Sequence, residues 1–328
     1  MKHLFLALCA ALTPLPSLAD TASALDDLIL PGFDKFEAAT AKLSAASQES
    51  CLPADVDAPY HAAFDAWMQV ADLHMGPSET RALSIAFWPD ARGFTPKSLS
   101  AMIADKDPVI SDPEAFMDVS IAARGFYALD MLLNDARFSD YAQEDYTCGL
   151  VRAIAFDLHQ QAAVLQSEWR ESFAKTLTRA GGSGNATYLS ADEATRALYT
   201  QIVSGLEFTA DTRLGSPLGT FERPRPKRAE AWRSGRSLRN SLLAVQAAYE
   251  LAQVLANQPL PETSLAMDKV QEAASHIQDP SFQDISDLQA RLRVEVLQQA
   301  VRDVKEAIET EVGKPLGIAP GFNSQDGD

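Results

Sequence analysis

The sequence predicts an all-α protein made of two bundles of antiparallel helices, with no significant sheet. Along the 328 residues the apolar side chains recur at helical spacing, and stretches of strict alternation rich in Val, Ile and Thr are nearly absent. The hydrophobic share of 46% and the charged share of 22% are typical of a chain that folds around a core. The length of the chain favours two domains over one.

Residues 1–19 have the pattern of a signal peptide. Lys2 precedes an apolar stretch from Leu4 to Leu12, and Ser17 and Ala19 place small residues at the usual positions before a cleavage site. We expect cleavage after Ala19 and export to the periplasm or beyond. No later segment has the length of continuous apolar sequence that a membrane-spanning helix needs, so the mature chain should have no transmembrane segment.

The helical pattern continues along the mature chain. Asp112 and Pro113 together predict the start of a helix. Aspartate is a common N-cap residue, and proline is tolerated in the first turn because the N–H that it lacks would have no intrahelical partner there. Ser190 and Glu193 form a capping box at another start, and Gly313 marks the end of the last helix. The predicted helices span residues 23–47, 57–75, 113–133, 143–179, 190–213, 235–257, 263–278 and 284–312.

The last of these helices has the clearest apolar pattern. Its apolar residues recur at spacings of three to five and predict one buried face, made of Leu288, Leu292, Val296, Val301, Val304, Ile308 and Val312. Such a face would pack the helix against the rest of its bundle.

A flexible segment near the middle of the chain predicts the domain boundary. Residues 181–185 read Gly-Gly-Ser-Gly-Asn, the strongest such segment in the sequence. We therefore expect an N-terminal bundle over residues 20–180 and a C-terminal bundle over residues 181–328. Residues 215–228 form a second irregular stretch that is locally basic and rich in proline. A solvated loop is the expected interpretation of this stretch, and a binding patch is the alternative.

Charge and cysteine content narrow the range of functions. The 45 acidic and 28 basic residues give a net charge of −17 and a pI near 4.7, so binding to nucleic acid is not expected. After removal of the signal peptide only Cys51 and Cys148 remain, in a chain sent to an oxidising compartment. This favours a disulfide between them over two buried thiols. Because there is no CxxC motif, the disulfide would be structural.

Motifs of well-known enzyme classes are absent from the sequence. It contains no HExxH, GxSxG, P-loop or GxGxxG motif. The few histidines form no zinc-binding pair, which argues against a standard zinc hydrolase. His61 and Asp65 lie four residues apart and could form one edge of a metal site, but a pair of surface partners is the simpler interpretation.

Residues 124–133, Arg-Gly-Phe-Tyr-Ala-Leu-Asp-Met-Leu-Leu, hold the strongest candidate site. On a helix Tyr127 and Asp130 occupy positions i and i+3, so their oxygens project from the same face. Gly125 costs about 1 kcal/mol inside a helix, which is understandable where another backbone or a ligand approaches closely. The residues alone leave a buried Tyr–Asp hydrogen bond near Arg124 open as the alternative.

Several segments resemble those of one protein family. Residues 125–130, Gly-Phe-Tyr-Ala-Leu-Asp, resemble the GxHxxE segment of the imelysin family. Phe87-Trp88-Pro89-Asp90 resembles a turn in the N-terminal domain of that family, and residues 232–238 are similar to another family segment. Residues 315–328 resemble the C-terminal GFNxxDGD ending of the family. The resemblance covers essentially the whole mature chain.

The resemblance implies a bacterial exported protein of two helical bundles with a site near their junction. The family is named for a metallopeptidase and overlaps proteins described as iron-regulated and linked to iron uptake. This sequence has Tyr127 at the family's histidine position and Asp130 at its glutamate position. Phenolate and carboxylate are hard oxygen donors that suit ferric iron better than zinc. Iron is therefore the expected metal, ahead of zinc, and peptidase activity is less expected.

Three functions follow from the residues and the resemblance. The leading hypothesis is binding of iron, or of an iron-containing ligand, in envelope iron acquisition, with Tyr127 and Asp130 as metal ligands at an interdomain site. The alternatives are a non-catalytic imelysin-like scaffold that binds other envelope proteins, and a metallopeptidase with altered metal ligation. Asp90 is also expected to cap a turn. Weaker candidates for the binding site lie in the matched segments: Gly125, Trp88, Asp90, Arg236, Ser237 and Asn323.

Overall fold

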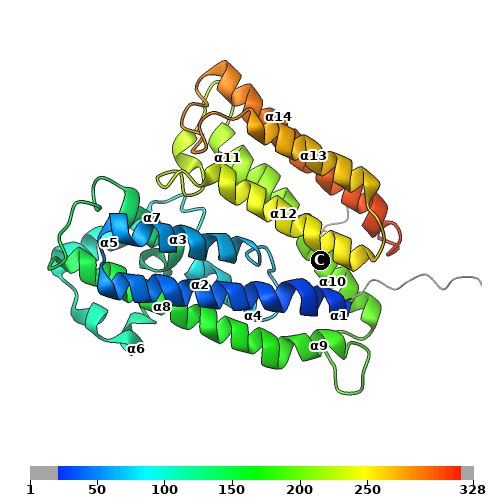
Figure 1. Cartoon of the computed structure of the whole chain (residues 1–328), viewed down its shortest axis with the longest axis horizontal. Coiled ribbons are helices and arrows are strands. Elements are labelled where there is room, and N and C mark those ends of the chain that lie inside the picture. Colours follow the sequence, from blue (N-terminus) through cyan, green and yellow to red (C-terminus); the bar gives the residue numbers. More distant parts are fainter. Residues whose placement is uncertain (1–20, 319–328) are drawn as a thin grey trace, which may run out of the picture.

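A computed structural model describes residues 21–318, and these fold into helices without a strand. Within that range one isolated bridge pairs Thr220 with Arg223. The prediction of an all-α protein is confirmed. Figure 1 shows two groups of helices, with α2, α3 and α8 in one and α11 to α14 in the other. The predicted signal peptide and residues 319–328 of the C-terminal segment that resembles the family, Asn323 among them, lie outside the described residues.

The N-terminal group forms around α2, which packs against both α3 and α8. Its core contains buried aromatic rings, among them Phe33, Phe36, Phe64 and Phe126. The π-helical residues Ala24–Ile29 join α1 to α2, and Trp169–Phe173 join α8 to α9. The α-helices of this group are α1 (Thr21–Ser23), α2 (Leu30–Glu49), α3 (Pro53–Met68), α4 (Pro77–Ile85), α5 (Phe94–Asp105), α6 (Pro113–Phe116), α7 (Gly125–Asn134), α8 (Tyr146–Glu168) and α9 (Ala174–Thr178).

In the C-terminal group α13 packs along α14, and α10 contacts both α12 and α14. The π-helix η5 (Thr209–Leu214) joins α10 to α11, and a second one, Glu309–Gly313, follows α14. None of the described helices combines the length and the hydrophobicity that a membrane span requires. The α-helices of this group are α10 (Ala191–Phe208), α11 (Gly215–Leu218), α12 (Ser237–Ala256), α13 (Pro261–Ser275) and α14 (Leu288–Ile308).

Helix caps are found where the sequence predicts them. The Asp112 carboxylate accepts hydrogen bonds from the backbone N–H groups of Glu114 and Ala115, both at 3.1 Å. The Ser190 hydroxyl accepts from the N–H of Glu193 at 3.2 Å, and the Glu193 carboxylate reaches back to an N–H of the preceding turn. The predicted domain boundary lies in the loop between α9 and α10, and the division into residues 20–180 and 181–328 stays a prediction.

The continuous helix predicted over residues 113–133 is wrong. The chain leaves the helix after Phe116 and starts α7 at Gly125. Gly125 has a φ of +70°, and a Cβ on it would lie 2.1 Å from the carbonyl oxygen of Ile85. Gly125 therefore permits a left-handed backbone and a close approach of α4, which a larger residue would prevent. The approaching group is backbone, one of the two possibilities that the sequence left open. Three helices, α4, α5 and the short α11, were not predicted.

The predicted buried face of α14 is also wrong in its first half. Leu288, Leu292 and Val296 are 61%, 51% and 51% exposed, whereas Val301 and Val304 are buried. Each residue turns the helix by about 100°, so the five-residue step from Val296 to Val301 moves the side chain by about 140°. The two halves of the apolar pattern consequently lie on different faces.

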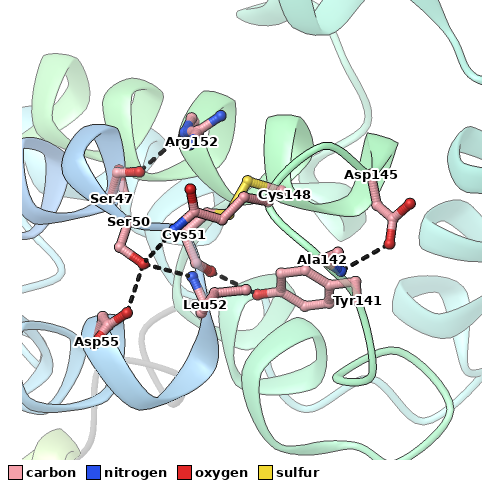
Figure 2. Close-up of a disulfide and its surroundings, with 11 residues drawn as sticks. Ser47, Ser50, Cys51, Leu52, Asp55, Tyr141, Ala142, Asp145, Cys148 and Arg152 are labelled. Carbon is pink, nitrogen blue, oxygen red and sulfur yellow. Dashed lines mark hydrogen bonds between the residues drawn. A yellow bond between two sulfur atoms is a disulfide. The ribbon is translucent and has the colours of Figure 1, made fainter.

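A disulfide joins the two remaining cysteines, as the sequence predicts. Cys51 lies between α2 and α3, and Cys148 lies in the first turn of α8 (Figure 2). The Tyr141 hydroxyl donates a hydrogen bond to the backbone carbonyl of Cys51 at 2.8 Å (Figure 2). The bond closes a loop over a sequence separation of 97 residues, for which the chain-entropy model gives a stabilisation of about 4 to 5 kcal/mol.

Candidate functional site

Tyr127 and Asp130 line a cleft between α7 and the C-terminal helices. The cleft has a volume of about 290 Å³. One wall comes from residues 87–96, before and at the start of α5, and the opposite wall from residues 227–233, before α12. Trp88 and Asp90 line this cleft as well, together with residues that sequence analysis did not single out as lining residues, chiefly Met131, Lys227, Arg228, Trp232 and Arg233.

Tyr127 is almost buried, and its hydroxyl is held by a carboxylate. The side chain is 9% exposed, and the hydroxyl donates a hydrogen bond to the carboxylate of Glu230, which is 3% exposed. The Trp88 ring stacks on the Tyr127 ring with a centroid separation of 6.4 Å. Burial, reinforced by the negative charge of Glu230, raises the pKa of the Tyr127 hydroxyl well above its usual range. The phenol is therefore neutral at physiological pH without a bound cation.

Behind Tyr127 lies a buried chain of charges that links the two groups of helices. Arg213 of η5 donates to Glu230 at 3.1 Å and to both oxygens of Asp72, which follows α3, at 2.9 and 3.0 Å. The Arg213 side chain is 4% exposed. Burial alone would lower the pKa of its guanidinium, but the two carboxylates outweigh burial and raise it. Two carboxylates against one guanidinium leave this cluster with one negative charge in excess.

Asp130 lies one turn further along α7 and is also buried. Its carboxylate accepts a hydrogen bond from the Tyr60 hydroxyl at 3.4 Å. Burial raises the pKa of the Asp130 carboxyl to about 6, although the neighbouring Ser234 and Arg233 favour the charged form. The Tyr–Asp hydrogen bond that the sequence left open does occur in this region, but Asp130 makes it with Tyr60, and Tyr127 pairs with Glu230 instead.

Trp88 and Asp90 have mainly structural contacts within the cleft wall. The Trp88 ring lies against Tyr127 and also meets the Phe208 ring edge-on, at a centroid separation of 5.9 Å. The Asp90 carboxylate accepts hydrogen bonds from the backbone N–H groups of Phe94 and Thr95 at 2.9 and 2.8 Å. Burial would raise the pKa of Asp90, but these donors lower it overall. Asp90 thus caps the turn before α5, as predicted.

Of the other weak candidates, Arg236, Ser237 and Gly125 are not part of the cleft lining. Arg236 is buried and donates to His61 Nδ1 at 2.8 Å and to Asp65 at 2.6 Å, so it links α12 to α3. His61 and Asp65 are therefore partners of an arginine, and the metal edge that their spacing allowed does not form. The Ser237 hydroxyl donates to the backbone carbonyl of Glu230 at 2.7 Å and so fixes the segment that carries the Tyr127 partner. Gly125 acts through the backbone contact described above.

Sequence reasoning did not single out Glu230, Arg213, Tyr60 or Asp72. One signal was present for Glu230, which stands between two alanines just before residues 232–238, a segment that resembles the family. Arg213 and Asp72 have no such signal, because they meet only through the packing of η5 against the end of α3. Among residues 21–318 no group of three or more His, Cys, Asp and Glu side chains is arranged to hold a metal ion.

Comparison with known families identifies the family of the chain. The family model of imelysin, a peptidase family by its name, matches residues 29–308. The chain belongs to the imelysin family. A search of curated protein sequences gave no match.

Two solved structures share the fold of this imelysin-family chain. An imelysin-like protein from Psychrobacter arcticum 273-4 has a TM-score of 0.74 and 15% identity, with 93% of this chain and 100% of that one covered. A protein from Parabacteroides distasonis ATCC 8503, provisionally named iron-regulated protein A precursor, has a TM-score of 0.73 and 14% identity, with 92% and 97% covered. These likenesses establish the fold alone.

Proposed function

We propose that this imelysin-family protein is exported and binds an iron-containing ligand in the cleft between α7 and the C-terminal helices, in the service of envelope iron acquisition. The observation that carries the proposal is the pair of oxygen groups, Tyr127 and Asp130, on one face of α7 and in the lining of one cleft. The provisional name of the Parabacteroides protein, which refers to iron regulation, is consistent with it.

The charges around the cleft favour a metal cation near these oxygens. The Asp72, Arg213 and Glu230 cluster behind Tyr127 has an excess of one negative charge, and ionised Asp130 adds another. Phenolate and carboxylate are hard donors, the class that ferric iron prefers. Binding to the Tyr127 oxygen requires loss of the phenol proton, and the Glu230 carboxylate, already hydrogen-bonded to the phenol, is in place to accept it.

The protein offers two oxygen donors, Tyr127 and Asp130, and this small number favours binding of an iron chelate rather than of a bare iron ion. In the described part of the chain the acidic, histidine and cysteine side chains form no cluster of three suited to a metal. A chelate brings most of its own donor atoms, so one phenolate and one carboxylate of the protein are enough to complete or orient the complex. A zinc peptidase site, in contrast, uses three protein ligands and an open position for water, so the residues around Tyr127 do not favour proteolysis.

A titration of the mature chain from Asp20 onward tests the proposal. Chelator-stripped protein is titrated with iron(III) supplied as citrate, with zinc, and with haem, while the absorbance is followed. A phenolate bound to iron(III) gives a visible charge-transfer band, so we expect a saturable band with the iron complex that is lost in Tyr127→Phe and weakened in Asp130→Asn. Tyr141→Phe is the matched control, because the Tyr141 hydroxyl bonds to the Cys51 carbonyl outside the cleft.

If none of these compounds bind, and wild type and variants behave alike, the proposal is wrong. The non-catalytic scaffold, with Tyr127 and Asp130 as core residues, would then be the better description. Cleavage of a peptide that a chelator abolishes would instead favour the metallopeptidase.

A further inference from the structure

Four basic side chains gather on the loop between α11 and α12, at the mouth of the cleft. They are Arg223, Arg225, Lys227 and Arg228, and we name them the basic lip. Arg223, Lys227 and Arg228 are exposed, and Arg225 is half-buried. One exposed acid, Glu222, precedes them. A local excess of positive charge is unusual in a chain whose net charge is −17.

The basic lip has no ion-pair partner in the described part of the chain. The ion pairs found among residues 21–318 all use other cations. Arg213, Arg233 and Arg236, which lie close by in the fold, are each held by carboxylates. The sequence favoured a solvated loop for this stretch. If that loop packed against acidic neighbours, the basic residues of the lip would form ion pairs with their carboxylates. Among residues 21–318 these positive charges are left without an acidic partner, so they are available to a ligand.

The backbone of the lip is fixed, so its side chains are presented from defined positions. The N–H of Arg225 donates to the Pro217 carbonyl at 2.7 Å, and the Gln283 side chain donates to the Pro226 carbonyl at 2.9 Å. Gly219 has a φ of +56°, and a Cβ on it would lie 2.5 Å from the Arg223 carbonyl oxygen. A preorganised loop loses less conformational entropy when it binds a ligand than a flexible one does.

The lip is continuous with the candidate site. Lys227 and Arg228 line the cleft that contains Tyr127 and Asp130. An acidic cluster, in which two carboxylates face one guanidinium, therefore lies behind Tyr127, whereas the lip contributes two cations to the lining of the cleft. A ligand with a cationic centre and anionic outer groups matches this arrangement of charge.

We propose that the ligand of the cleft is a ferric chelate with a net negative charge, whose outer carboxylate or other oxyanion groups are recognised by the basic lip. This inference rests on the proposed function and names the class of its ligand. The lip attracts the anionic periphery of the complex and raises its rate of association, while Tyr127 and Asp130 meet the metal. A neutral iron chelate lacks the electrostatic attraction to the basic lip.

Equilibrium binding of three probes separates the contribution of the lip from that of iron. The probes are ferric citrate, which is anionic, tris(maltolato)iron(III), which is neutral, and citrate without iron. The lip variant is Lys227→Gln with Arg228→Gln, and a second variant combines Arg223→Gln with Arg225→Gln. The matched control is Lys175→Gln with Arg179→Gln on and beside α9, because both of these side chains are exposed, take part in none of the ion pairs found, and lie outside the cleft lining.

We expect the Lys227/Arg228 variant to bind ferric citrate about tenfold more weakly than wild type at low ionic strength. The effect should shrink as salt is raised, because exposed charges are screened. The control variant should match wild type, and tris(maltolato)iron(III) should bind more weakly than ferric citrate and be insensitive to the lip variants.

Each failure has its own signature. Equal affinity for ferric citrate and tris(maltolato)iron(III), or lip variants that behave like the control, overturns the inference and leaves the proposed iron function standing. Lip-dependent binding of citrate alone, with no gain from iron and no band that depends on Tyr127, overturns the iron function and keeps an anion site at the lip. If none of the three probes bind, both are wrong.

Discussion

Two of the buried arginines among residues 21–318 belong to clusters with different charge balance. In the N-terminal group, Arg124 makes two hydrogen bonds with Asp157, at 2.7 and 2.9 Å, and donates to the Met117 carbonyl. At the junction of the two groups of helices, Arg213 forms ion pairs with both Asp72 and Glu230. The first cluster has one cation and one carboxylate, and the second has one cation and two carboxylates.

The difference indicates which cluster is part of a binding site. The Arg124 cluster is electrically neutral and satisfied by groups of its own bundle, which is what a structural pair needs. In the Arg213 cluster the surplus carboxylate, Glu230, relies on a neutral phenol, Tyr127, that lines the cleft. A bound cation could replace the phenol proton there. In the Arg124 cluster, by contrast, the single carboxylate, Asp157, is paired with the guanidinium and also accepts from the Gln161 amide.

The largest expected effects come from removing either arginine. Arg124→Met and Arg213→Met should each lower the free energy of unfolding by about 3–5 kcal/mol, because buried carboxylates lose their partner. Urea unfolding followed by circular dichroism measures the loss. The comparison predicts a difference in binding: only Arg213→Met should change the affinity for ferric citrate. Equal changes in affinity for the two variants would show that the clusters do not differ in function.

The pH dependence of stability gives the next largest effect. Asp130 has a pKa of about 6 in the folded protein against 3.8 as its ordinary value, so the folded state holds the proton more tightly than the unfolded state. A raised carboxyl pKa means that stability falls as the pH rises from about 4 to above 6. Over this window wild type should lose on the order of 3 kcal/mol relative to Asp130→Asn.

Unfolding midpoints in urea at a series of pH values measure this difference. Asp140→Asn is the control, because Asp140 is exposed and should give a profile parallel to that of wild type. Parallel profiles for wild type and Asp130→Asn would contradict the raised pKa of Asp130.

The smallest expected effect compares the two buried tyrosines. Tyr127→Phe removes the donor that satisfies the second carboxylate of the Arg213 cluster and should cost about 1–3 kcal/mol at pH 7. Tyr60→Phe removes a longer hydrogen bond, 3.4 Å, to Asp130 and should cost less. Thermal unfolding of both variants in the same buffer shows which of the two loses more stability relative to wild type. A larger loss for Tyr60→Phe would mean that Glu230 does not depend on the phenol.

Much of the fold could be predicted because its signals are local. The helical period, the caps at Asp112 and Ser190, and the end of the last helix depend on residues within a few positions of one another. Cys51 and Cys148 were the two cysteines left after the predicted signal peptide, so one pairing was possible, and that disulfide is present. Residues 125–130 marked Tyr127 and Asp130 for the same reason, since a helix places i and i+3 on one face.

What the sequence could not determine depends on contacts between distant segments. Tyr127, Glu230, Arg213 and Asp72 lie far apart in the chain and form one cluster only when η5, α7 and the end of α3 pack together. The apolar pattern of α14 named the correct residue types, but only its neighbours decided which face is covered. By itself the sequence determined most of the long helices, the disulfide and the two oxygen groups of α7. Tertiary packing decided their partners, because burial and charge pairing are properties of the assembled helices.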